Sequence, residues 1–182
     1  MTQFLGPYQV TAFNTAKDSD NKIHDDAVAR RFGFKGGLVP GVEVYAYMTH
    51  LPVARWGSAW LERGTAECRL LKPVYDGDEA TVTAAETADS LDLRVESRRE
   101  LCATGRAGLP PAPPSAPSIF ADAPMPPNPP ENRPAADETT LAVGTWFAIH
   151  PYRADGEDAQ QYLADVRETL PLYAAEGLVH PG

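Results

Sequence analysis

The chain has 182 residues, of which 43% are hydrophobic and 23% charged, as in a soluble protein of one ordinary domain or one small domain with extensions. Its formal net charge of −9 argues against nucleic acid as the main partner, because phosphate binding needs a basic surface. No run approaches the roughly 20 apolar residues of a membrane helix, and the start MTQFLGPYQV lacks the features of a signal peptide. We therefore expect a cytoplasmic protein that is not bound to a membrane.

Two cysteines and 18 prolines give further limits. Cys68 and Cys102 are too few for a disulfide framework or a zinc site, so we expect buried thiols. Eleven prolines fall between Pro110 and Pro134, where the chain has few backbone donors and favours extended polyproline geometry. The sequence predicts a linker at 110–134 that separates residues 1–109 from residues 135–182.

In the first part, a helical region precedes a series of strands. We expect a strand at 8–13, a short helix at 25–32 that Gly33 stops, and a glycine-rich loop. A helix at 42–51, interrupted by Pro52, and a further helical piece at 53–64 follow. Residues 91–97 alternate strictly between apolar and charged, which predicts a strand with one buried face. Strands are expected at 65–75, 79–87, 91–97 and 100–109, with the last two as antiparallel neighbours. The pattern indicates an α+β fold with a helix on one face of an antiparallel sheet.

The second part begins with a strand-like segment at 139–150 and continues with an amphipathic helix at 158–173. The sequence EGLVHPG at 176–182 resembles GGLVPG at 36–41, and each follows a helix. This short match indicates a duplication. Residues 135–182 would then be the beginning of an incomplete second unit.

Candidate chemistry lies at the polar segment DSDNKIHDD, residues 18–26, and the glycine loop after it. Residues 20–42, DNKIHDDAVARRFGFKGGLVPGV, together with KPVYDGDEATV at 72–82, resemble the MaoC-like, (R)-specific enoyl-CoA hydratase family. The positions that match the family's pattern are Asn21, Ile23, His24, Asp26, Gly33, Phe34 and Gly41.

The resemblance implies a hotdog fold for 1–109, with an antiparallel sheet wrapped around a central helix, and the start of a second hotdog unit at 135–182. It also implies a hydro-lyase that hydrates an enoyl-CoA or dehydrates a 3-hydroxyacyl-CoA thioester. His24 would be the acid–base residue, Asn21 would orient it, and the backbone amide at Gly41 would polarise the thioester carbonyl. The substrate is the CoA thioester, with no other cofactor and no metal. The implied partner is a second copy or another hotdog subunit.

One position departs from the family. The family's catalytic Asp lies five residues before the His, where this chain has Ser19. A hydroxyl is no carboxylate base near neutral pH, so Asp20, or Asp18, would have to replace it. Three alternatives stay open: a non-catalytic hotdog module that binds an acyl thioester or supports a partner subunit, a thioesterase that uses Glu43, and a plain Asx-rich turn that caps the next helix with Asp25 or Asp26.

Overall fold

The computed structural model describes residues 3–19, 22–113, 115, 135–144 and 155–182. The chain divides into two compact units, Met1–Pro114 with Gly156–Gly182, and Ser115–Asp155. The helices and strands of the described residues all belong to the first unit. In the part of the chain that the structure describes, no helix is long and apolar enough to span a lipid bilayer.

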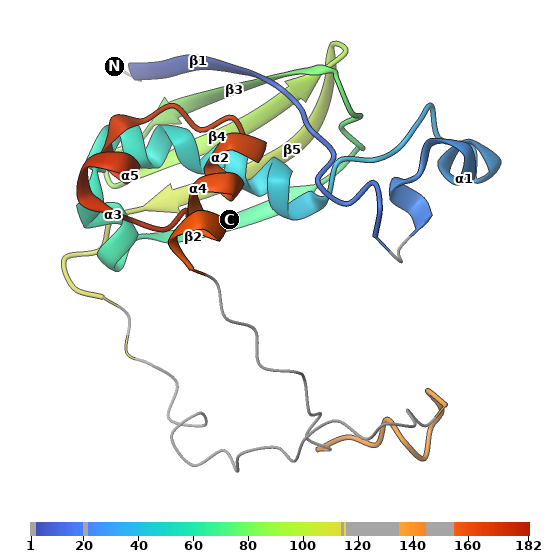
Figure 1. Ribbon diagram of the computed structural model, residues 1–182. Coiled ribbons are helices and arrows are strands. Elements are labelled where there is room, and N and C mark those ends of the chain that lie inside the picture. The colour runs from blue at the N-terminus through green and yellow to red at the C-terminus, as the bar shows by residue number, and fades with distance from the viewer. Residues whose placement is uncertain (1–2, 20–21, 114, 116–134, 145–154) are drawn as a thin grey trace. The chain divides into compact units, whose positions relative to one another are not determined.

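Five antiparallel strands form one sheet in the order β1-β3-β4-β5-β2 (Figure 1). In β4, Leu91, Leu93 and Val95 are 0–4% exposed and the intervening residues are exposed, so the predicted alternation is confirmed. The predicted pairing of β4 with β5 is also confirmed. The bounds are β1 (Gln3–Thr11), β2 (Thr65–Leu70), β3 (Glu79–Glu86), β4 (Ser90–Ser97) and β5 (Glu100–Gly108).

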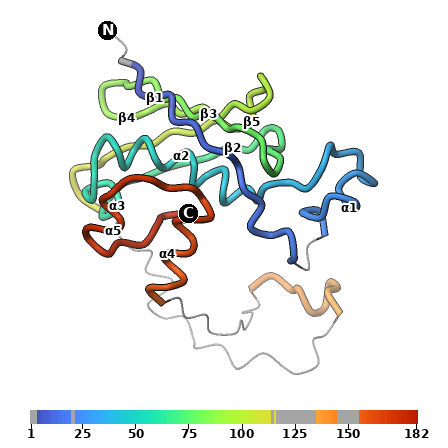
Figure 2. The backbone as a smooth tube through the Cα atoms, turned by 45° about the horizontal axis from the view of Figure 1, so that its top comes forward, coloured from blue at the N-terminus to red at the C-terminus, as the bar shows by residue number. Residues whose placement is uncertain are grey.

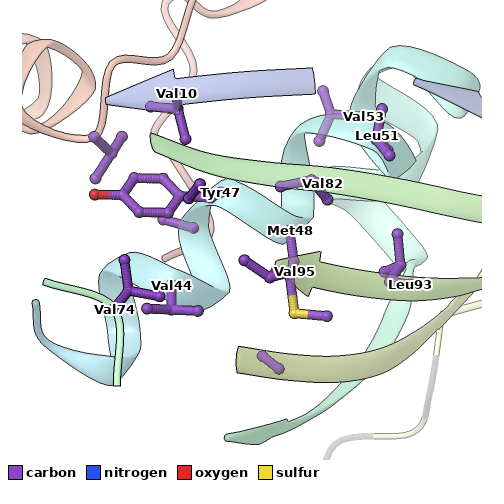
Figure 3. Close-up of a cluster of buried hydrophobic side chains, with 14 of the residues drawn as sticks. Val10, Val44, Tyr47, Met48, Leu51, Val53, Val74, Val82, Leu93 and Val95 are labelled. Carbon is purple, nitrogen blue, oxygen red and sulfur yellow. The ribbon is translucent and has the colours of Figure 1, made fainter. Parts of the chain in front are cut away.

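A long helix, α2 (Gly41–Trp56), packs its apolar face against this sheet. Figure 3 shows Tyr47 and Met48 of the helix among the side chains of the strands. Gly105 of β5 has to be a glycine, because a Cβ there would lie 2.6 Å from the backbone carbonyl oxygen of Glu67, and it would also lie 2.7 Å from Met48 Cε. The predicted α+β architecture, an antiparallel sheet against a central helix, is therefore confirmed.

The central helix is longer than predicted. It continues through Pro52 to Trp56 and ends at Gly57, whose φ is 63°. A proline inside a helix removes one backbone donor, and burial of Pro52 in the core offsets that loss. The second helical piece, expected at 53–64, is shorter: α3 (Ser58–Arg63) begins only after Gly57, and it ends before Gly64, as expected.

The polar segment folds as the capping interpretation predicts. A short 3-10 turn, η1 (Lys22–His24), leads into α1 (Asp26–Arg31). The side chain of Asp25 accepts hydrogen bonds of 2.9 Å from the N–H groups of Ala27 and Val28, so Asp25 is the N-cap. Capping by Asp25 does not exclude a functional role for His24 next to it.

The single helix predicted at 158–173 is wrong. The chain forms two helices, α4 (Gly156–Asp165) and α5 (Pro171–Glu176). Between them Arg167 has φ 58°, and the Glu168 carboxylate accepts hydrogen bonds from the N–H groups of Thr169 and Leu170. This local bonding competes with the helix, and Pro171 cannot donate to it.

The strand predicted at 139–150 is wrong where it can be checked. Residues 139–144 form turns and bends, because the Asp137 side chain accepts from the N–H groups of Thr139 and Thr140. Residues 145–150 of that predicted strand lie outside the described residues.

Residues 156–182, here called the C-terminal strap, lie over the side of α2 that is turned away from the sheet (Figures 1 and 2). Leu163, Val166 and Tyr173 of the strap are at most 8% exposed and join the same hydrophobic core. The strap thus completes the first unit. The division into a linker at 110–134 and the start of a second hotdog unit at 135–182 stays a prediction.

Candidate functional site

His24 and Gly41 line the same cavity, which has a volume of about 290 Å³. It lies between the glycine loop, the start of α2 and the segment after β2. Most of its wall is apolar, with Lys72 as its cationic member; the lining residues are His24, Phe34, Leu38, Val39, Gly41, Val44 and Leu70–Val74. The structure therefore brings together two of the four predicted site residues. The other two, Asp20 and Asn21, lie outside the described residues.

A hydrogen bond to the backbone orients the His24 ring. Its Nδ1 lies 2.7 Å from the carbonyl oxygen of Leu38. A carbonyl oxygen can only accept, so Nδ1 carries the proton. In the neutral imidazole the lone pair is then on Nε2, which is the arrangement that a general base requires.

Gly41 is the first residue of α2, directly after Pro40. The first N–H groups of a helix have no partner within the helix and lie at its positive end. A Cβ at position 41 would collide with Leu70 Cδ1, so glycine lets Leu70 close over the start of the helix. The cavity therefore has a helix N-terminus in its wall, a site suited to a developing oxyanion.

The carboxylate of Asp26 holds the glycine loop against the backbone of His24. Asp26 Oδ1 accepts a 2.6 Å hydrogen bond from the N–H of Gly37. A Cβ at Gly37 would collide with the carbonyl oxygen of His24, so the loop and the His24 backbone touch directly. Asp26, which matches the family's pattern, thus fixes the loop.

Ser19, at the position of the family's Asp, is not one of the residues that line the cavity. Its N–H donates to Ala16 O at 3.0 Å, and its carbonyl accepts from Lys22 Nζ at 2.9 Å. Asp18 is exposed and is also absent from the cavity wall. Among the described residues, therefore, no carboxylate is part of the wall that His24 and Gly41 share.

Glu43, the carboxylate that a thioesterase would use, is covered. Its side chain is buried, with Oε1 accepting a 2.7 Å hydrogen bond from Thr15 Oγ. The strap residue Tyr162 lies near it: burial first, and then the negative charge of Glu43, raise the pKa of the Tyr162 hydroxyl. Glu43 does not line the cavity, which weighs against the thioesterase alternative.

The sequence analysis missed a second buried polar cluster, under the strap. Glu168 accepts from His50 Nδ1 of α2 at 2.9 Å, and His180 Nε2 lies 3.9 Å from its other oxygen. Gly182 N–H donates to His180 Nδ1, so Nε2 carries the proton that faces Glu168. Tyr8 of β1 stacks on His50 with ring centroids 3.6 Å apart.

The charge of Glu168 is stabilised by this cluster. Burial alone would raise the pKa of Glu168, but the nearby imidazole of His180 and the hydrogen bonds from His50 and the Leu170 N–H outweigh it and lower the pKa from 4.5 to about 2. Glu168 is separated by over 100 residues from His50, so no local motif in the sequence could have identified the pair.

In the part of the chain that the structure describes, no group of three or more His, Cys, Asp or Glu residues could hold a metal ion. Cys68 and Cys102 are free thiols, and burial raises the pKa of each. Lys72 pairs with Glu100 at 2.6 Å next to the cavity, which raises the pKa of the Lys72 ammonium.

No family model and no curated protein matches the sequence. Solved structures do resemble it, with low identity. The (R)-hydratase of A. caviae involved in PHA biosynthesis is 19% identical, over 60% of this chain and 96% of that one, with a TM-score of 0.46. The R-hydratase PhaJ1 of Pseudomonas aeruginosa is 20% identical over 64% and 91%, with a TM-score of 0.46.

The ChsH1–ChsH2 complex of Mycobacterium tuberculosis is 14% identical, over 60% of this chain and 97% of that one, with a TM-score of 0.48. Similarity at this level carries no information on activity. The order of the strands and the helix packed against one face of the sheet are observed in this chain directly. By that topology, the chain has a hotdog fold.

Proposed function

We propose that the chain is a hydratase or dehydratase of the MaoC-like type, which acts on an enoyl-CoA or 3-hydroxyacyl-CoA thioester by acid–base catalysis. The observation that carries the proposal is that His24, with Nδ1 bonded to Leu38 O, and Gly41, at the start of α2, line one apolar cavity. A base and an oxyanion donor in one cavity are the two groups that such a reaction needs on a bound acyl thioester, and this supports the proposal.

In the proposed reaction, His24 Nε2 takes a proton from water, and the oxygen adds to the β-carbon of the enoyl thioester. The second acid–base group delivers a proton to the α-carbon, and His24 returns the proton that it took from water to solvent or to that group. The backbone N–H at Gly41 stabilises the enolate that forms between the two steps. Asn21 would orient His24, and Asp20 would be the second acid–base group in place of the family's Asp. These last two roles rest on the sequence resemblance.

The test is hydration of short and medium trans-2-enoyl-CoA substrates by the wild type, His24→Ala and Ser19→Asp. Loss of one acid–base group costs about 10²- to 10⁴-fold, so His24→Ala should lose that much of kcat. Ser19→Asp should raise the rate, because it restores a carboxylate at the family's position. Absence of turnover in the wild type and in Ser19→Asp, with both folded, would contradict the enzyme proposal.

The second candidate is a non-catalytic hotdog module that binds an acyl thioester or supports a partner subunit. The observation that favours it is Ser19, which replaces the carboxylate and does not line the cavity. Binding of an acyl-CoA without turnover, measured by calorimetry, would establish this candidate. We also propose that the protein associates with a second copy or with another hotdog subunit.

A further inference from the structure

We propose that Asn14 is the positioning residue for His24: its buried side-chain amide holds the His24 backbone in the one arrangement that directs the ring to Leu38. The inference rests on the proposed function for its catalytic consequence. Asn14 lies just after β1, ten residues before His24, and is 5% exposed. It is outside the family motif on which the sequence analysis depended.

Both ends of the Asn14 amide are used. Nδ2 donates to the His24 carbonyl at 2.7 Å, and Oδ1 accepts from the Ala16 N–H at 3.1 Å. The opposite orientation of the amide would place oxygen against oxygen at His24, so the contacts select one orientation. A buried side chain with both ends engaged cannot rotate without leaving polar groups unpaired.

The backbone of Asn14 is anchored as well. Its N–H donates to Asp76 Oδ1 at 2.9 Å, from the turn that precedes β3. Asn14 is therefore tied both to the turn before β3, through its N–H, and to the His24 backbone, through its side chain. The contact to the His24 carbonyl transmits that fixed position to a segment that otherwise consists of a 3-10 turn and loops.

The glycine loop closes on this contact from the other side. A Cβ at Gly37 would lie 3.1 Å from Asn14 Nδ2 and would collide with the His24 carbonyl. The next residue, Leu38, supplies the carbonyl that accepts from His24 Nδ1. Asn14 and Gly37 thus pack around the backbone of His24, while the Leu38 carbonyl accepts the hydrogen bond from its ring. Removing the Asn14 donor releases the His24 backbone from the side chain that fixes it.

The test uses Asn14→Ser, whose hydroxyl can still accept from the Ala16 N–H in a local turn but is too short to reach the His24 carbonyl. Asn14→Asp, which has the same shape without the donor, is the second variant. Thr15→Val is the matched control, because it removes the hydrogen bond to Glu43 from the same segment and leaves the contact to His24.

The first measurement is the NMR resonance of the His24 Nδ1 proton, assigned by its loss in His24→Gln. Asn14→Ser and Asn14→Asp should shift or broaden it, whereas Thr15→Val should leave it unchanged. An unchanged resonance in either folded Asn14 variant would overturn the inference. Because this measurement needs no substrate, it decides the positioning role even if the wild type has no hydratase activity.

The second measurement is the rate of enoyl-CoA hydration. A misplacement of the order of 1 Å can cost about 100-fold, so kcat should fall by about 10- to 100-fold in the Asn14 variants with KM little changed. The pH at half-maximal kcat should also move, because the environment of the His24 ring changes. A loss that is the same in Thr15→Val would mean a general loss of stability and would overturn the inference.

Discussion

Single residues shape the cavity, both by the side chains that line it and, at Gly41, by the absence of a side chain. Gly41 lets the Leu70 side chain lie over the start of α2, and Leu70 is 53% exposed on its other side. One methyl group added at position 41 would therefore change the cavity wall next to the helix N-terminus. This gives a test of the space beside the helix N-terminus that leaves the acid–base residues intact.

We predict that Gly41→Ala lowers kcat/KM for enoyl-CoA hydration by about 10- to 100-fold, because the new methyl group displaces Leu70 into the space of the acyl thioester. The melting temperature should change little, since alanine favours a helix over glycine and the flexible end of the Leu70 side chain can shift at small cost. The double variant Gly41→Ala, Leu70→Ala should recover part of the rate. An equal loss in the single and the double variant would contradict this account.

At the level of elements, the molecule depends on a contact that joins distant segments. The strap is held on α2 by its apolar residues and by Glu168, whose side chain is 2% exposed. The groups that face this carboxylate are His50 from α2, His180 from the strap, Tyr8 from β1 and Tyr173 from α5. His50 and Tyr8 lie outside the strap, so Glu168 links the strap to α2 and β1.

We predict that Glu168→Gln destabilises the protein by roughly 1–3 kcal/mol at neutral pH, the range for hydrogen bonds to a charged group. Amide hydrogen exchange should rise first in residues 156–182, where the contact is lost. Glu176→Gln, an equal charge change at an exposed position of α5, is the control and should leave exchange unchanged. Equal exchange in the two variants would show that Glu168 does not hold the strap.

The same carboxylate sets a dependence on pH. Its folded pKa of about 2 lies below the ordinary 4.5, so the ionised form contributes stability that is fully present above pH 4.5. That contribution is lost as the pH falls from about 4.5 toward 2. The difference in melting temperature between the wild type and Glu168→Gln should therefore be constant near neutrality and shrink below pH 4.5. A difference that grows on acidification would refute the assignment.

The sequence pattern predicted correctly those elements that depend on contacts between residues close together in the chain. The alternation in β4 and the capped helix after Asp25 both follow from contacts within a few residues. The helix expected at 158–173 failed for the opposite reason. Its apolar spacing was correct, but Glu168 turns inward to His50, which is far away in the sequence, and the helix ends before it.

For the candidate site, the sequence motif predicted that His24 and Gly41 belong together, and the cavity contains both. It could not identify Asn14, because an Asn after a strand is an ordinary turn residue until its burial and its contact to the His24 carbonyl are seen. It also placed Glu43 among possible catalysts, and only packing shows that Thr15 and the strap cover it.

For the whole molecule, the two edges of the sheet differ in their capacity to pair. β1 carries Pro7 and a register shift between Leu5 and Tyr8, features that disfavour pairing with another strand. β2 has neither, pairs with β5 over its whole length and has exposed apolar residues at its end, Leu70 and Leu71. An open, regular edge of this kind is suited to a second strand, so β2 is the edge at which we expect the proposed association.

We predict that light scattering gives a mass of about twice the 19.7 kDa of one chain, and that Ala66→Pro lowers it toward one chain. Leu71 donates to Cys102 O, and by the two-residue period the N–H groups of residues 66, 68 and 70 face the open edge of β2. Proline at 66 therefore removes a donor that a partner strand needs while the bonds to β5 remain. Ala66→Ser keeps the N–H and is the control. A wild type that stays monomeric at all concentrations would contradict the association, and a dimer that survives Ala66→Pro would place the interface away from β2.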